Sequence, residues 1–168
     1  MARGIWDTIG EEASRESVLW AEALRPDHER ELVAVFSPLG ESRYALGLET
    51  IYEGFLLHYG RPRLFAPDSG ETALLLGDYL YAHGLVRVAE CQNVVAVADL
   101  AELISLCAQL RADSAGGEGA AWAATAALLG RGPLRASREP VALARLVRET
   151  VVADALDHAL ALHAERVG

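Results

Sequence analysis

The chain has 168 residues, 52% of them hydrophobic, and a formal net charge of −9 at pH 7. That length suits one domain with a sizeable core, and the negative charge disfavours nucleic acid and anionic membranes as electrostatic partners. No apolar stretch reaches the ~20 uncharged residues of a membrane span, and the N-terminal segment lacks an apolar signal core, so we expect a cytoplasmic protein without a membrane span.

Glycine and proline residues divide the chain into segments with helical patterns, with no repeats and no strong strand alternation. The first half is expected to hold three helices, over 7–24, from Asp27 to just before Pro38, and over 42–59. The third of these is apolar on nearly all sides, which predicts a central position in the fold.

The fourth helix has the clearest start, because Asp68 is followed three residues later by Glu71, a spacing typical of a capping box. The second half of the chain is expected to hold helices over 69–90, 93–112, 120–130 and 140–166, with a flexible loop at 114–119. These elements predict that residues 1–168 form a single all-α domain, a helical bundle.

Two carboxylates interrupt the apolar third helix. Glu49 and Glu53 are four residues apart, so they share one face of a helix, and no basic residue lies three or four positions from either. Three interpretations are open. The pair forms a partly solvated face, it belongs to an altered or vestigial metal site, or it makes an inward salt bridge to arginines from another helix.

The fourth helix has leucines on opposite sides. One side carries Asp78 among apolar neighbours, which predicts a buried and hydrogen-bonded carboxylate (Leu74, Leu75, Ala82, Leu85). Leu76 and Leu80 lie on the other side. A helix that is apolar on both sides must be covered on both, so we expect a dimer with the 69–112 helices in its interface.

Arg61 and Arg63 flank Pro62 just after the helix that carries the two glutamates. Two guanidinium groups held beside a proline form a candidate anion site, and a solvated loop is the alternative interpretation.

The run LLLGDYLYAHGLVRVAE, residues 74–90, resembles the Gly-Asp-Tyr-Leu helix of trans-polyprenyl diphosphate synthases. Upstream, Glu49-Thr50-Ile51-Tyr52-Glu53 stands at the place of that family's first aspartate-rich motif, and His58-Tyr59-Gly60-Arg61-Pro62 at the place of Arg-Arg-Gly-x-Pro. Downstream, Ala108-Gln109 is similar to a Gly-Gln pair, 124–129 to Lys-Thr-Ala-x-Leu, and 143–167 to the final helix. The resemblance covers 45–167, with a deletion between 130 and 140.

The resemblance implies a shortened isoprenoid synthase fold. In that family acidic side chains bind Mg²⁺ that bridges an allylic diphosphate, so Glu49, Glu53 and Asp78 become candidate metal ligands and Mg²⁺ the candidate cofactor. By the same resemblance, the candidate ligand-binding residues are Arg61, Arg63 and Gln109. No catalytic residue is assigned.

The departures from the family pattern concern its charges. Only two acids remain in the first motif, His58-Tyr59 replaces the arginine pair, Ala124 replaces the lysine, and a second aspartate-rich motif is missing. Release of the diphosphate leaving group depends on electrostatic stabilisation of its negative charge. These losses therefore predict that the chain does not catalyse prenyl transfer.

We therefore expect a non-catalytic small or accessory subunit of isoprenoid metabolism, either a homodimer or a heterodimer with a catalytic prenyl synthase. One alternative is a Mg²⁺-dependent enzyme acting on isoprenoid diphosphates. The other is a structural or interaction protein that keeps the fold without a ligand.

Overall fold

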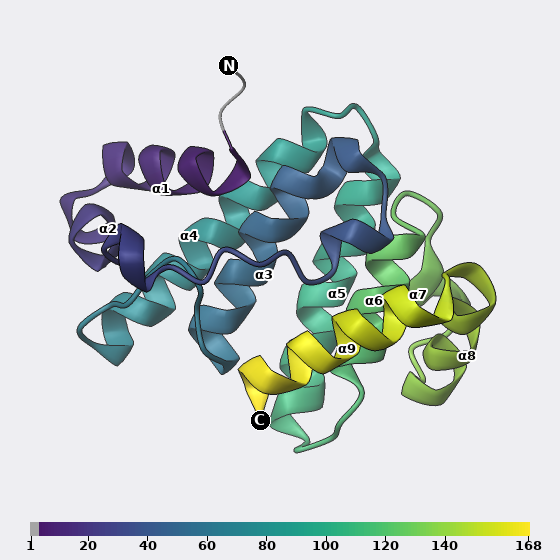
Figure 1. The fold of residues 1–168 in the computed structure, drawn as a ribbon. Helices are drawn as coiled ribbons and strands as arrows, with labels where there is room; N and C mark the ends of the chain where they lie inside the picture. Colours follow the sequence, from purple (N-terminus) through teal and green to yellow (C-terminus); the bar gives the residue numbers. More distant parts are fainter. Residues whose placement is uncertain (1–3) are drawn as a thin grey trace.

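The computed structural model describes residues 4–168 and confirms the all-α prediction, since nine α-helices and three 3₁₀ turns account for the regular structure of this part of the chain (Figure 1). None of these helices is long and apolar enough to cross a lipid bilayer. The α-helices are α1 (Ile5–Glu16), α2 (Val18–Ala23), α3 (Ala45–Tyr59), α4 (Gly70–Ala89), α5 (Val94–Ala112), α6 (Glu118–Ala127), α7 (Pro133–Ala136), α8 (Pro140–Thr150) and α9 (Ala153–Val167).

The N-terminal third differs most from the prediction. The helix expected over 7–24 is broken at Ser17, whose extended backbone ends α1 and whose hydroxyl accepts the Leu19 amide at the start of α2. The prediction of a helix that begins at Asp27 is wrong. After a 3₁₀ turn, Asp27–Glu29, the helix does not continue, and the backbone amide of Glu31 donates instead to the carbonyl of the distant Arg63 at 3.1 Å.

The helices expected over 69–90 and 93–112 agree with α4 and α5. The cap of α4 is Ser69, whose hydroxyl accepts the Thr72 amide at 3.1 Å, one residue later than the capping spacing suggested. The expected loop at 114–119 is shorter, because α6 already begins at Glu118. The helix expected over 140–166 is two helices, α8 and α9, since Val151 and Val152 adopt extended backbone between them.

Helix α3 lies at the centre of the fold, as its apolar composition predicts, and every residue from 47 to 57 is buried. Its main neighbour is α4, which runs antiparallel to it. Glycines of the two helices face each other at two levels. A Cβ on Gly54 would lie 2.9 Å from the carbonyl oxygen of Gly77, and one on Gly47 would lie 3.3 Å from that of Gly84. The two backbones therefore approach more closely than ordinary side chains allow.

This crossing decides which side of α4 is buried, and the side is opposite to the predicted one. Leu76 and Leu80 are buried beside the glycines, whereas Leu74 and Leu75 are 55% and 58% exposed. The side chain of Asp78 is 72% exposed, so the prediction of a buried carboxylate is wrong. The reason is that α4 has two apolar sides, and only the glycines at 77 and 84 permit close packing on α3.

We predict that Gly54→Ala lowers the free energy of unfolding by about 1–3 kcal/mol, the usual cost of overpacking. The added methyl group would meet the Gly77 carbonyl and the ring of Tyr81, 3.0 Å away. Thermal unfolding followed by circular dichroism measures the effect, at roughly 2–4 °C per kcal/mol for a chain of this size. Gly70→Ala is the matched control, because a Cβ there meets nothing within 4 Å. Equal melting temperatures for the two variants would contradict the close crossing.

Candidate functional site

Glu49 and Glu53 lie side by side on α3, and both are fully buried. Their common partner is Arg63, from the turn that follows α3, which is also fully buried. Its Nη1 donates to Glu49 Oε2 at 2.6 Å and its Nε donates to Glu53 Oε2 at 3.0 Å. The partly solvated face is therefore the wrong interpretation, and the inward salt bridge holds, with the arginine supplied by a turn. We call these three residues the Glu–Arg–Glu triad.

Backbone groups complete the hydrogen bonding of the triad. Glu53 Oε1 accepts from the amides of Arg63 and Leu64 at 2.9 and 2.7 Å, and Glu49 Oε1 accepts from the amide of Ser37 at 3.4 Å. Arg63 Nη1 also donates to the carbonyl oxygen of Val33 at 2.8 Å. All four carboxylate oxygens thus have donors, which is the condition under which buried charges are tolerated.

Aromatic rings cover the cation of the triad. The Arg63 guanidinium carbon lies 4.5 Å from the ring centroid of Trp6 and 4.9 Å from that of Tyr52. Burial by itself lowers the pKa of Arg63. The charges of Glu49 and Glu53 and their hydrogen bonds outweigh this effect and hold that pKa above its ordinary value. The arginine therefore stays charged.

Asp78, the third candidate metal ligand, is not part of this arrangement. It lies on the outer side of α4, where its Oδ1 is 3.1 Å from His58 Nε2. Within residues 4–168, no three His, Cys, Asp or Glu side chains are grouped so that they could hold a metal ion. Glu49 and Glu53 do not fit a Mg²⁺ site in this arrangement either, because Arg63 and backbone amides already occupy their oxygens.

The three candidate ligand-binding residues are in different surroundings. Arg63 belongs to the triad. Arg61 is exposed and lies near Glu31. The pKa of Glu31 is lowered first by a hydrogen bond from Arg166, then by the charge of Arg166, and after that by the charges of Arg61 and Arg25. Gln109 is exposed on α5, in a hollow that also contains Arg138 and neither of the two candidate arginines. The structure does not bring the three residues together.

A second buried polar contact, which the sequence did not indicate, joins α3 to α9. The Tyr52 hydroxyl lies 2.8 Å from Nδ1 of His163, and the ring of Trp122 packs against that of Tyr52 at 5.0 Å between centroids. Burial lowers the pKa of His163 to about 4, so its imidazole is neutral at pH 7. Residues 52 and 163 are too far apart in the chain for any helical spacing to reveal the pair.

Comparison of the chain with protein-family models, with curated proteins and with solved structures finds no match. The resemblance to polyprenyl diphosphate synthases therefore rests on the order and spacing of its motifs.

We predict that Arg63→Met strongly destabilises the fold, because it leaves two buried carboxylates without their cation. Breaking a buried pair in this way costs about 3–5 kcal/mol. Urea unfolding measures the loss, and adding Glu49→Gln and Glu53→Gln to Arg63→Met should recover part of it, since no buried charge remains. The control is Arg43→Met, in an exposed pair with Glu41, with an expected effect within about 0.5 kcal/mol. Similar losses for the two arginine variants would contradict the triad's role.

We predict that stability falls as the pH drops from about 6.5 toward 4. The unfolded chain then binds a proton at residue 163, with an ordinary histidine pKa of ~6.5, whereas folding lowers the pKa of His163 to about 4. The slope from this one group is at most about 1.4 kcal/mol per pH unit. Urea unfolding at several pH values should show a smaller slope for His163→Gln than for His158→Gln, an exposed control on the same helix. Equal slopes would refute this assignment.

Proposed function

We propose that this chain is a non-catalytic, polyprenyl diphosphate synthase-like subunit of isoprenoid metabolism, which acts by associating with another chain. The Glu–Arg–Glu triad is the observation that carries the proposal. In the resembling family, acidic side chains at the positions of Glu49 and Glu53 bind Mg²⁺. Here the corresponding oxygens accept hydrogen bonds from Arg63 and from backbone amides. A metal ion at this position would have to displace a buried guanidinium group.

The positions of the family's arginine pair support the same proposal. Prenyl transfer requires cationic groups that stabilise the departing diphosphate. His58 instead lies against Asp78 and stacks on Tyr81, with ring centroids 5.0 Å apart. The ring of Tyr59 packs against that of Phe55, with centroids 5.3 Å apart, and its centroid lies 5.5 Å from the guanidinium carbon of Arg111. Both side chains are thus engaged within the protein and leave the diphosphate without its arginine partners.

The outer side of α4 and the start of α5 support association. Leu74, Leu75 and Val86 are exposed along α4, and Val94 is exposed at the first position of α5. An apolar hollow lies at the junction of the two helices, between Ala89 and Val97. Exposed apolar groups that share one side of a helix are typical of protein interfaces. We assign this surface to a homodimer or to a heterodimer with a catalytic prenyl synthase.

Light scattering tests the assembly. The purified chain should have twice the 18.0 kDa mass of one copy, or should form a stoichiometric complex with a catalytic prenyl synthase. Val86→Arg should weaken that association by at least about tenfold, because it places a charge in an apolar interface. Val141→Arg, at an exposed position on α8, is the matched control and should have no effect. A wild-type monomer at tens of micromolar that forms no such complex would contradict the assembly.

A catalytic assay tests the other half of the proposal. The isolated chain, supplied with Mg²⁺ and with isopentenyl and allylic diphosphates, should form no prenyl product. Product formation that Glu49→Gln abolishes would show instead that the glutamates serve catalysis, and would favour the enzyme alternative.

A further inference from the structure

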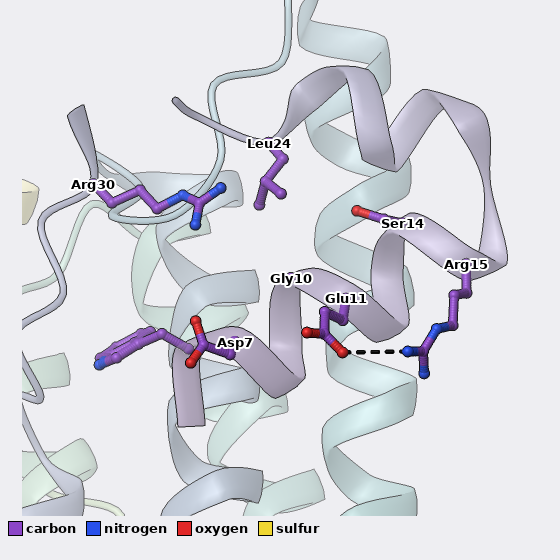
Figure 2. Close-up of a pocket in the computed structure, with 8 residues that line it drawn as sticks. Asp7, Gly10, Glu11, Ser14, Arg15, Leu24 and Arg30 are labelled. Atoms are coloured by element: carbon purple, nitrogen blue, oxygen red, sulfur yellow. Dashed lines mark hydrogen bonds and ion pairs between the residues drawn. The ribbon is translucent and has the colours of Figure 1, made fainter. Parts of the chain in front are cut away.

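A hollow of about 380 Å³ lies between α1 and the segment that runs from Leu24 to Arg30 (Figure 2). Its size is within the range of small-molecule sites. Gly10 forms its floor, Trp6 and Leu24 supply apolar walls, and Asp7, Ser14 and Arg30 supply polar groups. The hollow shares the ring of Trp6 with the Glu–Arg–Glu triad but contains none of the triad's charged residues, and it shares no residue with the α4–α5 surface. The proposed function therefore makes no use of it.

Two opposite charges line this hollow without pairing with each other. The carboxylate of Asp7 has no ion-pair partner among residues 4–168. Arg30 Nε donates to the carbonyl oxygen of Arg25 at 2.8 Å, and its Nη1 lies 2.7 Å from Asp27 Oδ1. These two contacts fix the guanidinium group and leave its Nη2 without a partner in the described part of the chain. Figure 2 shows Asp7 on α1 and Arg30 on the facing segment.

The remaining lining residues contact one another or other parts of the protein. Glu11 and Arg15 pair with each other on α1 at 3.2 Å. A Cβ on Gly10 would lie 3.2 Å from Leu24 Cδ1, so a larger residue would press on the leucine that lines the hollow. The ring of Trp6 also contacts the Arg63 guanidinium, whose carbon lies 4.5 Å from the ring centroid, and this contact holds the ring in place.

We propose that this hollow binds a small zwitterion of the α-amino-acid type. The ammonium group would contact Asp7, the carboxylate would accept from Nη2 of Arg30, and an apolar side chain would lie against Leu24 and Trp6. A lone cation would leave Nη2 of Arg30 without an acceptor, and a lone anion would leave the carboxylate of Asp7 without a partner. Guanidinium groups bind carboxylates directionally, which suits a donor already fixed by two other contacts.

Calorimetric titration of the full chain tests the proposal, with L-leucine as the probe. L-leucinamide lacks the carboxylate, and 4-methylpentanoate lacks the ammonium group. L-leucine should bind saturably, and each analogue should bind at least about tenfold more weakly, the minimum expected for losing one charged hydrogen bond. The absence of saturable L-leucine binding would overturn the proposal. Equal binding of L-leucinamide would also overturn it, since the hollow would then be a site for cations alone.

Variants locate the binding. Asp7→Asn and Arg30→Gln should each weaken L-leucine binding by at least about tenfold. Asp154→Asn is the matched control for the first, because Asp154 lies in the first turn of α9 as Asp7 does in α1. Arg148→Gln, on the exposed side of α8, is the control for the second. Circular dichroism checks that each variant is folded. If Arg30→Gln does not fold, the test rests on Asp7→Asn. L-leucine binding to Asp7→Asn as tight as to the wild-type chain would then overturn the proposal.

Discussion

A guanidinium group that is cut off from water must have its charge neutralised and its donors satisfied, and much of this fold meets that requirement for Arg63. The neutralising carboxylates come from α3, a further acceptor comes from Val33, and the covering ring of Trp6 comes from α1. One buried cation thus ties together three parts of the chain. Replacing such a triad with well-packed apolar residues is often neutral or stabilising, so we infer that its main effect is to specify how these parts are arranged.

The triad also shows which part of the site the sequence pattern predicts and which part it does not. The spacing of four residues predicts that the glutamates share one helical face, and the structure confirms it. Their partner follows them by 10 and 14 residues, outside any helical spacing, and it sits in a turn whose path depends on the folded chain. The pattern therefore could not distinguish a metal site from an ion pair. It also gave no reason to connect Tyr52 with His163, since only the packing of α9 on α3 brings them together.

Helix α4 shows a different limit. Its extent was predictable from composition and flanking residues, and so was the all-α class. Periodicity identifies the residues that share a side, but it does not choose between two apolar sides. The choice depends on Gly77 and Gly84, which allow close contact with α3, and the leucine-rich side with Asp78 is left outside as a result. Leu74 and Leu75, which periodicity places with the core, therefore lie on the surface proposed for association.

The glycine crossing between α3 and α4 also limits how the sequence can change over evolutionary time. In most cores, a residue that grows larger can be accommodated when a neighbour across the contact becomes smaller. At this crossing a Cβ on each glycine would meet a backbone carbonyl of the other helix as well as a side chain, such as Val88 opposite Gly47 or Ile51 opposite Gly84. A smaller side chain at the opposing position would therefore leave the carbonyl in the way. A substitution is accommodated only if the two helices move apart, which disturbs the triad on α3 and the outer side of α4 together. Gly47, Gly54, Gly77 and Gly84 should consequently vary less among descendants of this sequence than the leucines around them.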